Sequence, residues 1–277
     1  MKAVLIAVFP ALMVTQVSFA GIHTVYDHKN ISPTPESCVM NSYVDLAFIR
    51  ADFQCGDKNN FSLIWDTKAE QTTNIDHKGK QYMTITLKDS KAMAQAMAPQ
   101  MEKMKKVQEQ LAAQLKNMPP DQRKMMEKAL GGQQQQMIAN GPRTIKKTGT
   151  STVGSYKCDL YDTFVGGQKT GESCIADWSQ TKVDHKKYLA VVTTWQKHIE
   201  DMTKSMSNIS ATRDWGDWAK GFMVKHSQYN QGKVVSQMTI KSIADKSLSS
   251  DLGKPPADYK KGPSPVEMMK AQAAKNK

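Results

Sequence analysis

SYKCDLYDTFVGGQKTGESCIADW, residues 155–178, decides the fold class of this chain of 277 residues. Two stretches of alternating polar and apolar residues flank the glycine-rich turn GGQKTG. Alternation with a period of two indicates a half-buried β-strand, and a glycine-rich turn between two such strands indicates a β-hairpin. Cys158 lies on the first predicted strand and Cys174 on the second, so a disulfide across the hairpin is expected. The chain should therefore be built on antiparallel sheet.

The same alternation occurs on both sides of this hairpin. In QYMTITL, Met83 and Ile85 share an apolar face, and in NFSLIWD, Trp65 belongs to a similar face. The breaks GDKNN and DHKG contain the residues that favour turns, so they predict further hairpins. After residue 220 the stretches GFMVKH and KVVSQMTIKSI resume the strand pattern. Few connections resemble βαβ crossovers, which favours an α+β fold with one antiparallel sheet.

Two segments have the composition of helices. Residues 90–132 contain no aromatic residue and are rich in Ala, Met, Gln, Lys and Glu, which are strong helix formers. They predict a helical insert that Pro119 interrupts, with a second short helix over residues 122–130. Residues 186–206 predict another helix, whose apolar residues form one stripe. That stripe contains Tyr188, Val191, Val192, Trp195, Ile199, Met202 and Met206.

The first 20 residues have the layout of a secretory signal peptide. Lys2 precedes an apolar run that ends in Ser18-Phe19-Ala20, a small-x-small site, so cleavage is expected after Ala20. The run is too short for a membrane-spanning helix, which needs about 20 apolar residues. The expected organisation is a signal peptide over 1–20, one domain over 21–261 and a flexible tail over 262–277. The mature protein should be soluble and periplasmic.

Four cysteines in an exported chain indicate disulfides. Sequence alone allows three pairings, and we favour the two local ones, Cys38–Cys55 and Cys158–Cys174. A bridge that closes a loop of this length stabilises a protein by about 3 kcal/mol, chiefly by restricting the unfolded chain.

The formal net charge is +12. A nucleic-acid binder would carry such a charge, but here the lysines are spread along the chain and the expected compartment holds no such partner. No nucleic-acid partner is therefore expected. A solvated basic surface that can meet anionic lipid headgroups is the preferred interpretation.

Three stretches resemble a family of exported bacterial proteins of unknown function, which is itself similar to the lipoprotein carriers of the LolA/LolB type. They are DHKGKQYMTITL, the hairpin STVGSYKCDLYDTFVGGQKTGESCIADW, and the C-terminal run GFMVKH…MTIKSIADKSL…LGKPPADYKK. The resemblance implies an open half-barrel, in which a strongly curved antiparallel sheet wraps over helices and encloses an apolar hollow. It implies no catalytic residues, and a shared fold alone does not define a function.

A stripe of methionines runs along the helical insert and has three interpretations. It can be the buried face of an ordinary amphipathic helix. It can line a pocket for a hydrophobic ligand, because methionine adapts to irregular shapes and is frequent on promiscuous binding surfaces. It can also bind copper, because thioethers select Cu(I), although the insert lacks His and Cys. A helix of this kind that docks on a protein partner is a further alternative.

The preferred function is a non-catalytic, soluble periplasmic carrier for a lipid-like ligand. The predicted ligand-binding residues are Met97, Met101, Met104, Leu111 and Leu115 on the insert, with Trp65, Met83 and Ile85 on the sheet. Lys105 and Lys106 are expected to meet an anionic headgroup. No cofactor and no metal ligand are assigned, because no two histidines or cysteines have metal-ligand spacing on one element. The chain has no nucleophile elbow, phosphate loop or HExxH motif, so an enzyme is not expected.

Overall fold

The computed structural model describes residues 18–32, 34–56, 59–116, 119, 122, 143–206 and 220–275. For part of the helices, and for a few residues beside the gaps, this description covers the backbone alone. The elements are β1 (Ser18–Asn30), β2 (Glu36–Val44), β3 (Phe48–Cys55), β4 (Asn59–Asp66), β5 (Gln71–Asp76), β6 (Gln81–Thr86), α1 (Leu87–Lys116), β7 (Arg143–Val153), β8 (Tyr156–Val165), β9 (Gln168–Ala176), α4 (Leu189–Met206), β10 (Phe222–Asn230), β11 (Lys233–Ser249), β12 (Lys260–Lys261) and α5 (Pro265–Lys275).

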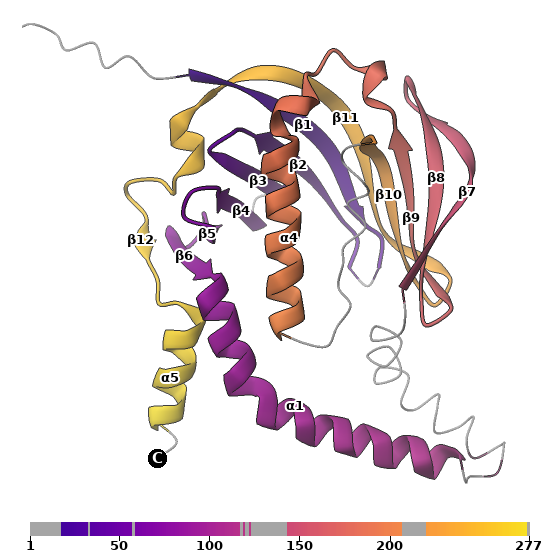
Figure 1. The fold of residues 1–277 in the computed structure, drawn as a ribbon, viewed down its shortest axis with the longest axis vertical. Coiled ribbons are helices and arrows are strands. Elements are labelled where there is room, and N and C mark those ends of the chain that lie inside the picture. The colour runs from indigo at the N-terminus through magenta and orange to yellow at the C-terminus, as the bar shows by residue number, and fades with distance from the viewer. Residues whose placement is uncertain are drawn as a thin grey trace, which may run out of the picture.

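The strands form one sheet of 12 strands in the order β12-β6-β5-β4-β3-β2-β1-β11-β10-β9-β8-β7. Every neighbouring pair is antiparallel except β12 and β6, whose two-residue pairing is parallel. The sheet does not close, and Figure 1 shows it curving around α4. This confirms the α+β fold with one largely antiparallel sheet that the sequence pattern predicts, and the open half-barrel that the resemblance implies.

The predicted hairpins form where the turn residues lie. β8 and β9 are joined at Gly166 and Gly167, which have φ of 56° and 81°. Two successive residues with positive φ match the twist of the flanking strands, and glycine adopts such angles without strain. The breaks GDKNN and DHKG likewise connect β3 to β4 and β5 to β6. Turn chemistry thus sets the register that decides which side chains face inward.

Both cysteine pairs form disulfides, as the local pairing predicts. Cys38 and Cys55 are directly opposite each other on β2 and β3, with their Cα atoms 4.2 Å apart. Cys158 and Cys174 are diagonal neighbours on β8 and β9, with a Cα separation of 5.4 Å. Disulfides persist in oxidising compartments, so the two bridges indicate an extracytoplasmic protein.

The main core lies between α4 and the concave face of the sheet. It contains Ile22, Tyr26, Met40, Trp65, Trp178, Tyr188, Val192, Phe222 and Val224, all buried. A smaller core lies on the convex face, where Phe48, Ile64, Ile75 and Leu248 pack with Leu252 and Tyr259. The chain after β11 therefore covers part of the convex face, and the β3–β6 region is packed on both sides.

Helix α1 begins at Leu87, three residues before the predicted start. Thr86 and Asp89 form a capping box, in which Asp89 Oδ2 accepts the backbone N–H of Thr86 at 2.9 Å and Thr86 Oγ1 accepts that of Asp89 at 3.1 Å. Pro99 lies inside the helix, and Figure 1 shows that α1 bends along its length. Proline removes one hydrogen bond of the helix, which explains a bend rather than a break.

The segment from residue 262, predicted to be a flexible tail, contains helix α5. Ser264 and Glu267 cap its start, since Glu267 accepts the backbone N–H of Ser264 at 2.6 Å. Helix α5 contacts α1. The short helix predicted at 122–130 lies outside the described residues, apart from Gln122.

Candidate ligand-binding site

A partly enclosed cavity of about 170 Å³ lies between α4 and the concave face of the sheet. Its walls are mostly apolar, and β1 to β5, β10, β11 and α4 all contribute to them. The lining residues are Thr24, Tyr26, Met40, Ser42, Val44, Ile49, Ala51, Phe53, Leu63, Ile64, Trp65, Thr72, Val192, Trp195, Gln196, Ile199, Met223 and Met238. A concave, mostly apolar space with a few polar groups is typical of a site for a hydrophobic ligand.

The strand register explains why these side chains meet. Ile49 on β3 is opposite Trp65 on β4, and Trp65 is opposite Thr72 on β5. Residues two apart on a strand point to the same face. Ala51, two residues after Ile49, and Leu63, two residues before Trp65, therefore also face the cavity. The concave face is therefore a continuous surface assembled from consecutive hairpins.

Helix α4 closes this surface with the stripe that the sequence predicts. Val192, Trp195 and Ile199 line the cavity, and Val192 and Tyr188 are buried. In the full chain the hydroxyl of Tyr188 donates a hydrogen bond to the backbone oxygen of Ala20 at 2.7 Å, a contact that the expected cleavage after Ala20 removes. Figure 1 shows α4 lying inside the curve of the sheet.

The predicted sheet residues fall on the concave face but in different places. Trp65 lines the enclosed cavity, whereas Met83 lines a second, wider recess of about 820 Å³. Ile85 shares this face and lines neither space. Phe53 borders both spaces and stacks on Phe61, with ring centroids 4.4 Å apart. It therefore lies between the enclosed cavity and the wider recess.

The predicted methionine stripe runs along α1, which contacts α4. The side chains of Met97, Met101, Met104, Leu111 and Leu115 lie outside the described part of the chain, so their role stays a prediction. The same holds for Lys105. Lys106 is exposed and pairs with Glu102 at 2.9 Å, which leaves it accessible to solvent.

The sequence did not single out the residues of α4 and of β1 and β2 as ligand contacts. The apolar stripe of residues 186–206 predicted only that this helix packs against the rest of the fold, which is the usual meaning of such a stripe. Val192 and Ile199 contact the cavity only because the sheet curves away beneath them. Sequence periodicity contains no signal for that curvature.

Burial shifts the titration of two groups near the cavity. Desolvation raises the pKa of Tyr26 well above its ordinary value of 10.0. Desolvation also lowers the pKa of His198 below 6.5, against the opposing attraction of Glu70 and Asp201. Both groups are therefore neutral near pH 7, as an apolar site requires.

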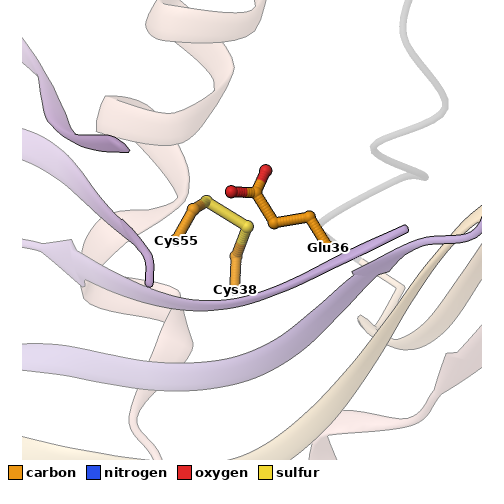
Figure 2. Close-up of side chains that lie close together, drawn as sticks. All are labelled: Glu36, Cys38 and Cys55. Atoms are coloured by element: carbon orange, nitrogen blue, oxygen red, sulfur yellow. A yellow bond between two sulfur atoms is a disulfide. The ribbon is translucent and has the colours of Figure 1, made fainter. Parts of the chain in front are cut away.

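Glu36, Cys38 and Cys55 are the group of potential metal-binding side chains in the described part of the chain, and Figure 2 shows them together. Their ligand atoms lie within 4.8 Å of one another. The two sulfur atoms are joined in a disulfide, whereas a thiol binds a metal as the free thiolate. The trio is therefore not a metal site in this oxidation state.

A serine and a histidine are hydrogen-bonded on the convex face. Ser62 Oγ lies 2.7 Å from His77 Nε2, and His77 Nδ1 lies 3.0 Å from the Tyr259 hydroxyl. Ser62 is fully buried, and its hydroxyl donates to the Asp52 carboxylate at 2.5 Å. A nucleophilic serine needs a base that takes its proton, but here the proton is directed to Asp52.

The remaining hydrogens of this network follow from the donor inventory. Because Ser62 donates to Asp52, it accepts from His77 Nε2–H, and His77 Nδ1 then accepts from Tyr259. Arg50 completes the network by donating to Asp52 at 2.6 Å and to the backbone oxygen of Leu252 at 3.0 Å. We name Arg50, Asp52, Ser62, His77 and Tyr259 the convex clasp. It attaches the segment after β11 to the sheet.

None of the described helices is long and apolar enough to cross a membrane. No protein-family model matches the chain, and a search of curated proteins gives no significant match.

Several solved structures are similar in fold. An uncharacterized conserved protein from Thermus thermophilus aligns with a TM-score of 0.45 at 9% identity, over 89% of this chain and 91% of that chain. Pseudomonas aeruginosa MucB, in a complex with MucA, aligns with a TM-score of 0.36 at 8% identity, over 87% and 57%. PNGF-II aligns with a TM-score of 0.39 at 8% identity, over 91% and 32%. The function is therefore argued from the side chains of this chain.

Proposed function

We propose that this chain is an exported, non-catalytic protein that binds or carries a hydrophobic, lipid-like ligand in the periplasm. The enclosed apolar cavity between α4 and the sheet is the observation that carries the proposal. A folded protein packs its interior closely, so an apolar space of this size is costly unless a ligand fills it. The two disulfides and the signal-peptide layout of residues 1–20 support the compartment.

The first test is native mass spectrometry of protein purified from the periplasm without detergent. We expect a co-purifying mass in the range of a lipid, and a chain that begins at Gly21. A parallel titration uses a fluorescent hydrophobic probe, whose emission rises on transfer from water to an apolar site. Protein that carries no ligand and binds no probe in its folded state would show that the proposal is wrong.

A cavity-filling variant tests whether the probe binds under α4. Ala51 lines the cavity, so Ala51→Leu places extra methyl groups in the space that the ligand needs. Ala69 is exposed in the turn between β4 and β5, and Ala69→Leu is the matched control. We expect probe affinity to fall roughly ten-fold or more in the first variant, equivalent to about 1.4 kcal/mol, and to stay unchanged in the second. Equal affinities would exclude this cavity as the site.

A further inference from the structure

Two cavity-lining residues, Trp65 and Thr72, and a third residue beside them, His198, each have a buried polar side-chain atom without a hydrogen bond. Trp65 Nε1, Thr72 Oγ1 and His198 Nε2 have no hydrogen bond to any described residue. Trp65 and Thr72 are directly opposite each other on β4 and β5, and both line the cavity. His198 on α4 lies beside them, with its ring centroid 6.2 Å from that of Trp65. Trp65 is 2% exposed and His198 7%.

Such a cluster indicates a missing partner. About nine in ten buried polar groups in proteins have a hydrogen bond, and leaving one unpaired is costly. These three come from three different elements, β4, β5 and α4, and Trp65 is a neighbour of both other residues. The other described side-chain atoms without partners, in Asp45 and Asn60, belong to other regions of the fold.

The chemistry of the three groups defines what they can bind. The indole N–H of Trp65 can only donate, and the hydroxyl of Thr72 can donate or accept. His198 is neutral because burial lowers its pKa, so its ring offers either a donor or an acceptor. The complementary group must therefore accept a hydrogen bond from Trp65, and an oxygen with two lone pairs can accept a second one from Thr72 or His198. A carbonyl or carboxyl oxygen satisfies this requirement.

We propose that Trp65, Thr72 and His198 bind the carbonyl oxygen of an acyl chain, from a fatty acid or an acyl ester, whose hydrocarbon part fills the cavity. This inference rests on the proposed function and names the ligand class for the same site. The cavity of about 170 Å³ is similar in size to engineered apolar cavities of about 150 Å³ that take benzene. A short chain therefore fits the cavity as it stands, and a longer one extends toward the recess beyond Phe53.

The test compares octanoic acid, methyl octanoate and octane as competitors of the hydrophobic probe in the full-length mature protein. We expect both oxygen-containing ligands to bind about ten-fold more tightly than octane, because well-placed hydrogen bonds contribute on this scale. A preference for the acid over the ester assigns the site to free fatty acids. Equal binding of the acid and the ester assigns it to the carbonyl oxygen that they share.

Two variants identify the polar groups. Thr72→Val removes the hydroxyl with little change of shape, and Trp65→Phe removes the indole N–H. Each should reduce the preference over octane several-fold while octane itself still binds. Thr73→Val is the matched control, because Thr73 is the next residue on β5, faces the other side of the sheet and does not line the cavity. Thermal unfolding confirms that each variant is folded. If Trp65→Phe does not fold, Thr72→Val alone is enough for the test.

The outcomes separate this inference from the proposed function. If the acid, the ester and octane bind equally, the cavity is a hydrophobic site, and water is the partner of the three polar atoms. The same conclusion follows if the preference over octane survives Thr72→Val and Trp65→Phe. If none of the three ligands displaces a probe that does bind, acyl ligands are excluded. If the probe itself does not bind, the proposed function fails as well.

Discussion

At the scale of single residues, buried polar groups distinguish the two faces of the sheet. On the convex face the clasp satisfies its members, and each of Ser62, His77 and Tyr259 has a partner. On the concave face Trp65 Nε1 and His198 Nε2 have none among the described residues. A satisfied network stabilises and orders its surroundings, whereas an unsatisfied one is costly unless a ligand completes it. The first group is therefore interpreted as structural and the second as functional.

The clasp predicts a stability effect far from the cavity. Tyr259→Phe removes the hydroxyl that donates to His77 Nδ1 at 3.0 Å, and the free energy of unfolding should fall by about 1 kcal/mol. Urea denaturation measures this change. Tyr229→Phe is the control, because the Tyr229 hydroxyl lies 3.5 Å from Glu172, at the limit of a hydrogen bond. A loss no larger than that of the control would mean that the clasp does not hold the segment after β11.

His198 predicts how stability depends on pH. Its pKa is lowered by burial in the folded chain and is about 6.5 in the unfolded chain. Below that pH the unfolded chain binds a proton that the folded chain resists, so stability is lost as the pH falls through 6.5. His198→Gln should flatten the curve of unfolding free energy between about pH 5 and 7. A residual slope is expected, because burial also lowers the pKa of His28. An unchanged slope would contradict the prediction.

At the scale of elements, two helices with different compositions have different relations to the sheet. Helix α4 has aromatic and β-branched residues in its stripe and lines the cavity with Val192, Trp195 and Ile199. Helix α1 has methionines in its stripe, leaves the sheet after β6 and contacts α4 and α5. The position of α4 makes it the cover of the enclosed cavity. For the methionines of α1, the interpretations from the sequence all stay open: a buried helix face, a hydrophobic pocket, a copper site or a surface for a protein partner.

A thioether-deleting variant separates copper binding from hydrophobic binding. Replacing the closely spaced Met93, Met97, Met101 and Met104 of this stripe with leucine keeps it apolar but removes these four thioether sulfurs. We expect the hydrophobic probe to bind this variant as it binds the original chain, and we expect no Cu(I) binding by either protein. Cu(I) binding that disappears in the variant would favour the metal-handling alternative over the carrier.

At the scale of the whole molecule, the sheet is an open half-barrel whose two edges are β7 and β12. Its concave side is filled by α4 and its convex side is partly covered by the segment after β11. The full chain has a formal net charge of +12. Under the proposed function, this excess of positive charge would favour the approach of the protein to an anionic membrane.

This arrangement predicts salt-dependent membrane association. The protein should sediment with vesicles that contain anionic phospholipid at low ionic strength. It should be released at about 0.5 M salt, because the Debye length then falls to a few ångströms. Vesicles of zwitterionic lipid alone are the control. Equal sedimentation with both kinds of vesicle, or binding that resists salt, would show that surface charge does not direct the association.

The sequence by itself determined the antiparallel sheet, its hairpins and the stripe of α4. Alternation and turn residues such as Gly166 and Gly167 are local signals, and the alternation around Trp65, Met83 and Ile85 correctly placed them on one face. The local cysteine pairing was also predictable, because hairpin neighbours lie close in space. The family resemblance to LolA/LolB-type carriers correctly implied the open, curved sheet.

Only the tertiary structure decided which helix covers the cavity and where polar atoms are left without partners. Trp65 and His198 are 133 positions apart in the chain, and no local pattern relates them. Their approach depends on the curvature of the whole sheet and on the path of the chain into α4. The convex clasp has the same origin, because it joins β3 to β5 with a segment from the far end of the chain. Such contacts arise from the packing of distant elements, which periodicity along the sequence does not encode.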